Sequence, residues 1–122
     1  MGWSEVAAQL SDPPGMAGPP EDLEHLRAIV ATVLESGRAE DLAVSTGAVC
    51  DLAVTPTPLS GPPHDVVLVS APNGVHPPPR GQVRIQHLAL VGHQDSITRP
   101  VAEAVALFWR FMIEKYGIAP DG

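Results

Sequence analysis

The segment PVAEAVALFWRFMIEKYG, residues 100–117, decides the fold because it predicts an unusually apolar helix. Pro100 suits the first turn of a helix, and Lys115 suits the negative end of the helix dipole. Gly117 suits a C-terminal cap, where a left-handed backbone is needed. The sequence therefore predicts a C-terminal helix of about 17 residues.

Two adjoining faces of this predicted helix are apolar when it is wound at about 3.6 residues per turn. The first face consists of Val101, Ala104, Val105, Phe108, Phe111 and Met112. The second consists of Ala102, Ala106, Trp109, Ile113 and Tyr116. One sheet face cannot cover both, so we expect a second cover, either the N-terminal arm or another chain. Trp109, Ile113 and Tyr116 are the predicted contact residues of a homodimer.

One further helix is predicted before the strands, and the N-terminal segment is either a short helix or a docking arm. Pro19 and Pro20 precede acidic residues that suit a helix N-terminus, and Gly37 suits its C-terminal cap, which predicts a helix over about residues 20–36. Its apolar stripe consists of Leu23, Leu26, Val30, Val33 and Leu34. The helical spacing of Trp3, Val6, Ala7 and Leu10 favours a short N-terminal helix or docking arm, the alternative cover for the C-terminal helix.

The middle of the chain has the patterns of strands. Residues 41–45 and 48–55 flank Thr46-Gly47, which is typical of a hairpin, and the apolar run 65–70 indicates a strand covered on both faces. Residues 82–91 begin with strict alternation, which predicts Val83, Ile85 and His87 on one face. We expect His87 to be a buried core histidine that is hydrogen-bonded.

These elements predict an α+β fold with a single domain, residues 1–122. We expect a two-layer sandwich, in which a small, mainly antiparallel sheet of about four strands packs against an N-terminal and a C-terminal helix. Residues 1–19 form an N-terminal arm with a proline-rich linker, and residues 20–122 form the core. A doubly wound parallel sheet is disfavoured, because residues 41–92 hold several strand patterns and no helical one.

Composition excludes several classes of protein. The chain has 14 acidic and 7 basic residues, a formal charge of −7, and its basic residues are scattered, which argues against nucleic acid or an anionic membrane as partner. Cys50 is the only cysteine, so neither an intrachain disulfide nor a two-thiolate zinc site is expected. The first ten residues do not resemble a signal peptide, and no apolar run is long enough for a membrane span. We therefore expect a cytoplasmic protein.

The densest polar group lies in residues 92–99, predicted as a loop between a strand and the C-terminal helix. As a ligand site, His93 would act as acid or base, Asp95 would orient it, and Arg99 would hold a carboxylate or phosphate, with Ser96 beside them. The alternative is that Asp95, Ser96 or Thr98 only caps the helix. No metal, cofactor or catalytic residue is predicted, because no catalytic or nucleotide-binding motif occurs.

Two functions remain open on this basis. The first is a non-enzymatic protein-interaction module, such as an adaptor, small chaperone or accessory subunit, that forms a homodimer. It is favoured by the negative charge, the missing catalytic motifs and the surplus apolar helix surface. The alternative is a small-molecule binding protein or enzyme that uses the loop at residues 93–99.

Overall fold

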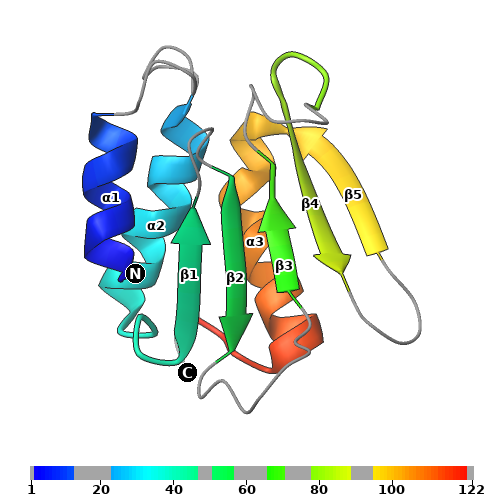
Figure 1. Cartoon of the computed structure of the whole chain (residues 1–122). Coiled ribbons are helices and arrows are strands. Elements are labelled where there is room, and N and C mark those ends of the chain that lie inside the picture. Colours follow the sequence, from blue (N-terminus) through cyan, green and yellow to red (C-terminus); the bar gives the residue numbers. More distant parts are fainter. Residues whose placement is uncertain are drawn as a thin grey trace.

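Figure 1 shows the computed structural model of the chain, which describes residues 2–12, 23–46, 51–56, 66–70, 78–88 and 95–120. Gly47 of the predicted hairpin, Cys50, and His93 of the predicted site lie outside these residues. The described elements follow in the order α1 (Trp3–Ser11), α2 (Glu24–Ser36), β1 (Leu42–Thr46), β2 (Leu52–Pro56), β3 (Val66–Val69), β4 (Gln82–Leu88), β5 (Asp95–Pro100), the 3₁₀ turn η3 (Val101–Glu103), α3 (Ala104–Phe111) and the π turn η4 (Met112–Tyr116).

The strands form one antiparallel sheet with the order β1-β2-β3-β4-β5. The predicted α+β sandwich is confirmed, and the predicted hairpin is the β1–β2 pair, in which Thr46 lies opposite Leu52. The strand count differs from the prediction, because the described residues form a sheet of five strands instead of about four. The additional strand is β5, which pairs with β4 and occupies most of the segment that was predicted as a loop.

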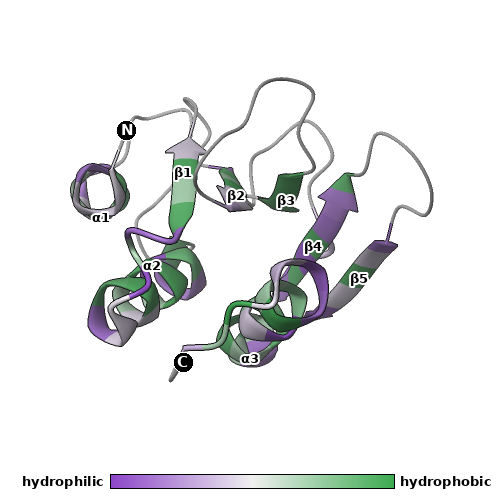
Figure 2. Cartoon of the chain, turned by 90° about the horizontal axis from the view of Figure 1, so that it is seen from below, coloured by the Kyte–Doolittle hydropathy of each residue, from purple (hydrophilic) through white to green (hydrophobic). Residues whose placement is uncertain are grey.

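The helices cover one face of the sheet. Figure 2 shows α2 and α3 side by side on the same side of the strands, whereas α1 lies near the β1 edge. Of the two alternatives for the N-terminal segment, the structure has the short helix, α1, with Trp3, Val6 and Leu10 buried. It packs mainly against α2 and β1, so it lies at the opposite side of the sheet from β5.

Helix α2 follows from its apolar spacing and its glycine cap. Leu26, Ile29, Val30 and Val33 recur at three- and four-residue intervals and are all buried. Leu34, predicted in the same stripe, is 40% exposed and lies at its margin. Gly37 ends the helix with φ +78°, a left-handed conformation that glycine adopts without steric cost.

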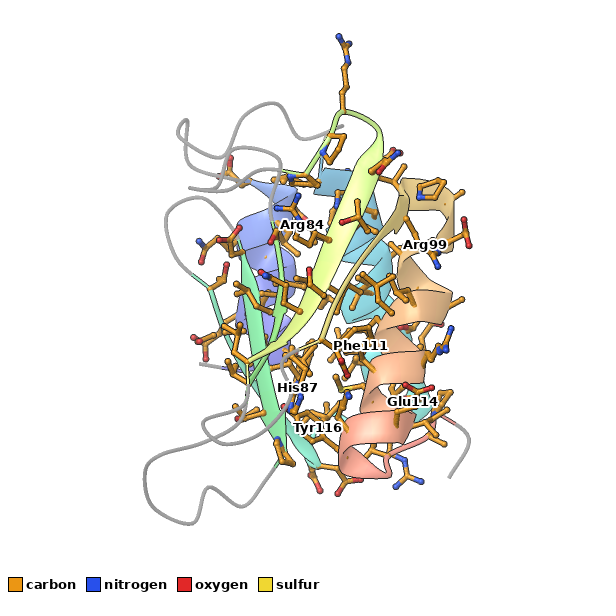
Figure 3. The ribbon with its side chains drawn as sticks, turned by 90° about the vertical axis from the view of Figure 1, so that its right-hand side faces the viewer. Arg84, His87, Arg99, Phe111, Glu114 and Tyr116 are labelled. Carbon is orange, nitrogen blue, oxygen red and sulfur yellow. The ribbon has the colours of Figure 1, made fainter. Side chains whose placement is uncertain are left out.

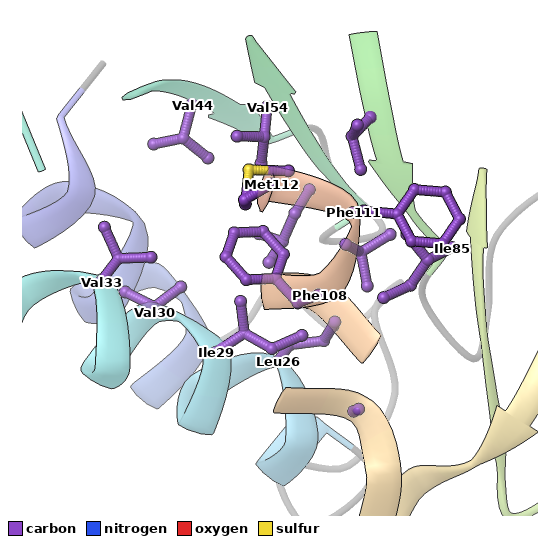
Figure 4. Close-up of a cluster of buried hydrophobic side chains, with 14 of the residues drawn as sticks. Leu26, Ile29, Val30, Val33, Val44, Val54, Ile85, Phe108, Phe111 and Met112 are labelled. Carbon is purple, nitrogen blue, oxygen red and sulfur yellow. The ribbon is translucent and has the colours of Figure 1, made fainter. Parts of the chain in front are cut away.

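The core lies between the helices and the sheet. Figure 4 shows Phe108 and Met112 of the C-terminal helix gathered with Ile29 and Val30 of α2 and with Val54 of β2. Phe108 and Met112 are fully buried. Burying one such side chain stabilises the fold by about 1.5–3 kcal/mol, so this cluster fixes the distance between the two layers.

The predicted C-terminal helix is confirmed in extent. It runs without interruption through η3, α3 and η4, and Gly117 ends it with φ +69°. The backbone N–H of Gly117 donates to Ile113 O at 3.1 Å, and that of Ile118 donates to Met112 O at 3.2 Å. Among the helices that the structure describes, none has the length and apolar character needed to cross a bilayer.

Candidate functional site

Of the predicted site residues, the three that the structure describes do not converge. Asp95, Ser96 and Arg99 lie on β5, and successive side chains of a strand point to opposite faces of the sheet. Asp95 and Arg99 lie opposite His87 and Val83, on the face that carries the helices, whereas Ser96 lies on the other face. Along one strand Asp95 and Arg99 are about 13 Å apart. Figure 3 shows Arg99 toward the opposite end of the sheet from His87.

A different polar group forms where β4, β5 and the end of the C-terminal helix meet. We call it the end cluster: His87, Asp95, Lys115 and Tyr116. Asp95 lies directly opposite His87 in the β4–β5 ladder, and its carboxylate accepts a hydrogen bond from the Lys115 ammonium. The Tyr116 ring meets the His87 ring edge to face, with 6.4 Å between ring centroids (Figure 3).

Contacts of the end cluster tie the C-terminal helix to several strands. The Tyr116 hydroxyl donates to the backbone oxygen of Val54 at 3.2 Å, and thereby reaches β2, while Lys115 reaches β5. His87 is 8% exposed, so the predicted burial of this histidine is confirmed. The π turn that carries Lys115 and Tyr116 is of a kind often found at functional positions. Here its polar groups are engaged in anchoring contacts, which favours a structural role for the cluster.

The predicted dimer residues are largely covered within one chain. Trp109 is 6% exposed, and its indole N–H donates to Thr32 Oγ1 of α2 at 3.0 Å. Tyr116 is half-buried against β2 and β4, and only Ile113, at 50%, is well exposed. The second cover of the C-terminal helix is therefore α2, which neither predicted alternative named. Amphipathic patterns show how wide an apolar face is, but they do not show which element packs on it.

The sheet face opposite the helices carries a mixture of small, apolar and polar side chains. We call it the open face, because no described helix packs on it (Figure 2). Its strand residues have intermediate or high exposure. They are Ala43, Ser45, Ala53, Thr55, Val66, Leu68, Gln82, Arg84, Gln86, Leu88, Ser96, Thr98 and Pro100.

The strand register places apolar and polar side chains in different parts of the open face. One row across the sheet runs from Ala43 through Thr55 and Val66 to Leu88, so it is mostly apolar. Arg84 and Thr98 lie opposite each other in another row, and Arg84 Nε donates to Thr98 Oγ1 at 3.4 Å. Arg84 is the only charged residue among the open-face residues named above.

Sequence reasoning missed the open face because β3 was predicted to be covered on both sides. In the structure Val67 and Val69 are buried, whereas Val66 and Leu68 on the other face are only partly so. A run of four apolar residues does not show alternation, so the pattern alone hides the half-exposed side. The adjacent β-branched residues Ile97 and Thr98 were the available signal for β5.

No family model, curated protein or solved structure matches the chain. Within the described residues, no three His, Cys, Asp or Glu side chains come together in a group that could hold a metal ion.

Proposed function

We propose that this protein is a protein-interaction module, an adaptor, small chaperone or accessory subunit, which binds its partner through the open face. The observation that carries the proposal is the one-sided sheet. Leu42, Val44 and Val54 are buried beneath the helices, whereas Ala53 and Leu68 on the reverse side retain exposure without a described helix over them. Exposed contiguous apolar surface of this kind is typical of interaction sites.

The chemistry of the open face favours an apolar, uncharged partner surface. The chain has a formal charge of −7, yet Arg84 is the only charged residue among the open-face residues. The central strands present short or branched side chains there, such as Ala53, Thr55 and Val66, so the surface loses little side-chain entropy on binding. Interface centres are depleted in charged residues, and this face has that composition.

A capture experiment with two matched variants tests the proposal. Leu68→Glu places a carboxylate in the middle of the open face, whereas Leu34→Glu makes the same change on α2, where Leu34 is 40% exposed. Wild-type protein and both variants are used to capture proteins from the native host, and each captured protein is purified and its affinity measured. We expect Leu68→Glu to weaken binding by about tenfold or more and Leu34→Glu to leave it unchanged.

Two results would contradict an open-face site. One is equal affinity of wild type and Leu68→Glu for the same purified partner, and the other is equal weakening by both variants. Circular dichroism and thermal unfolding of each variant show whether a loss of binding comes from a loss of fold.

The alternative function, a small-molecule site at residues 93–99, has less geometric support. Asp95 and Ser96 lie on opposite faces of β5, and Arg99 lies a strand's length from Asp95. A thermal-shift screen with metabolites and metal ions tests it directly. Stabilisation that is lost in Arg99→Ala and retained in Arg80→Ala would favour this alternative over the interaction module.

A homodimer remains part of the proposed function, but its predicted interface needs revision. Burial of Trp109 and the engagement of Tyr116 leave only Ile113 of the three predicted contact residues well exposed. A single half-exposed side chain provides little of the apolar area that a stable dimer buries.

A further inference from the structure

The two edges of the sheet differ in their surroundings. At the β1 edge, α1 packs alongside, and Trp3 Nε1 donates to the backbone oxygen of Leu42 at 2.8 Å. At the other edge is β5, and no described strand pairs with its outer side (Figures 1 and 2). An unpaired strand is a template for pairing with another chain.

The hydrogen-bond pattern identifies which backbone groups of β5 point outward. The N–H of Val101 donates to Gly81 O at 3.0 Å. Val101 lies opposite Gly81 in the register, so its backbone groups point toward β4. Antiparallel ladders alternate, which directs the backbone of Ile97 inward and that of Ser96 and Thr98 outward. On the other side of β4, Ser70 N–H donates to Arg84 O at 3.0 Å, as this alternation requires.

A side-chain contact agrees with this assignment. Arg99 Nη1 donates to the backbone oxygen of Thr98 at 3.0 Å, and Arg99 is exposed. The Arg99 guanidinium therefore hydrogen-bonds to a backbone carbonyl, that of Thr98, which is not paired with β4. The next outward residue, Pro100, has no N–H to offer, so the pairing groups of this edge are the N–H and C=O of Ser96 and Thr98.

We propose that β5 pairs antiparallel with β5 of a second copy of this chain, centred on Ile97. In this register Ser96 lies opposite Thr98 of the other copy, and the outward N–H and C=O groups satisfy one another. Asp95 lies opposite Arg99 of the other copy, on both sides of the centre, and the two Ile97 side chains meet. Each residue from Asp95 to Arg99 thus meets a group that complements it, with opposite charges at the two ends of this stretch.

The neighbouring contacts allow this arrangement. Arg99 exchanges the Thr98 carbonyl for the Asp95 carboxylate of the other copy, while the carbonyl accepts a backbone N–H instead. Asp95 keeps Lys115 of its own chain, because a carboxylate has two oxygens and accepts several hydrogen bonds. The twofold axis stands perpendicular to the sheet, so both helix layers lie on one side and the two open faces join on the other.

Disulfide trapping tests the register. Opposite residues of a non-hydrogen-bonded antiparallel pair have Cα atoms about 4.5 Å apart, within disulfide range, so Ile97→Cys places two thiols across the twofold axis. The matched control is Thr98→Cys, because the two copies of this residue lie about 8 Å apart in the proposed register. Both are made in a Cys50→Ser background, which removes the native thiol.

Under mild oxidation at high micromolar concentration we expect Ile97→Cys to become a covalent dimer and Thr98→Cys to remain monomeric. Equal trapping of both variants, or trapping of neither, would overturn the proposed register. Thermal unfolding of the reduced proteins checks that each variant folds.

Charge reversal provides a second test that needs no new cysteine. Arg99→Asp places a carboxylate opposite Asp95 of the other copy, and Arg80→Asp makes the same change in net charge at an exposed turn residue. We expect sedimentation at low salt to show dimer dissociation constants raised by about tenfold or more for Arg99→Asp and changed by less than about twofold for Arg80→Asp. A wild-type chain that is monomeric throughout, or equal effects of both variants, would refute the pairing.

Discussion

The indole N–H of Trp109 donates to Thr32 Oγ1 at 3.0 Å and so joins α3 directly to α2. The same hydroxyl donates its proton to the backbone oxygen of Ile29 at 2.7 Å, so a lone pair on Thr32 Oγ1 is available to accept the indole N–H. Trp109 is 6% exposed, so its N–H has little access to water as a substitute acceptor. This contact explains why the most apolar helix of the chain needs no second chain to cover its Trp109 side.

Thr32→Val tests the contribution of that hydrogen bond. The substitution keeps the side-chain shape but leaves the indole N–H without its acceptor, so we expect the free energy of unfolding in urea to fall by about 1–2 kcal/mol. Thr32→Ser retains the hydroxyl and is the matched control, with a smaller loss. If the free energy of unfolding of Thr32→Val is no lower than that of Thr32→Ser, the contact adds nothing to stability.

Trp109→Glu and Ile113→Glu separate burial within the chain from burial in a dimer. Trp109→Glu removes a buried aromatic side chain and buries a charge, so we expect a loss of about 3 kcal/mol or more. Ile113 is 50% exposed, and Ile113→Glu should change stability by less than about 0.5 kcal/mol. Sedimentation of wild type and Ile113→Glu checks the alternative. If the wild type is a dimer and Ile113→Glu is a monomer, the C-terminal helix is the dimer interface after all.

Gly37→Ala tests the left-handed cap of α2. An added Cβ at Gly37 meets no atom within 4 Å, so the cost comes from the backbone conformation at φ +78° and not from a clash. We expect a loss of about 1 kcal/mol for Gly37→Ala in chemical unfolding, and a smaller loss for Gly37→Asn, because asparagine tolerates this region better. Equal losses for both variants would point to a cause other than the φ angle.

A double-mutant cycle of Lys115→Met and Asp95→Asn measures the ion pair of the end cluster. The Lys115 side chain is 22% exposed and that of Asp95 is 40% exposed, so water screens the pair in part. We expect a coupling energy of about 0.5–1 kcal/mol that declines as salt is raised. A coupling energy indistinguishable from zero at low salt would remove the ion pair from the contacts that hold the helix end.

Sequence patterns predicted the elements whose local rules agree with their surroundings. Helix α2 has a regular apolar stripe and a glycine at the position that requires a positive φ, and both features appear in the structure. The face formed by Val83, Ile85 and His87 likewise follows from alternation alone. In these places periodicity, capping and burial all favour the same conformation.

The prediction was wrong at β5 because two local rules compete there. Asp95, Ser96 and Thr98 are residues that suit the start of a helix, and Pro100 follows them, so a cap before the C-terminal helix was a reasonable interpretation. Pairing with Gln82–Leu88 decides in favour of the strand, and that partner is not visible in the local sequence. The strand also directs Asp95 and Ser96 to opposite faces of the sheet, whereas the site prediction placed them together in a loop. His93 lies outside the described residues, so the site itself stays a prediction.

With β5 pairing as proposed, α1 beside β1, where Trp3 Nε1 donates to Leu42 O, would limit the assembly to two copies. Each monomer then has one sheet edge that is available for pairing, β5, and one edge, β1, against which α1 packs. Pairing at β5 uses the available edge of both copies, so the assembly stops at a dimer. Detaching α1 would expose the β1 edge of each copy, so dimers could then pair β1 to β1 and a closed pair would become a filament.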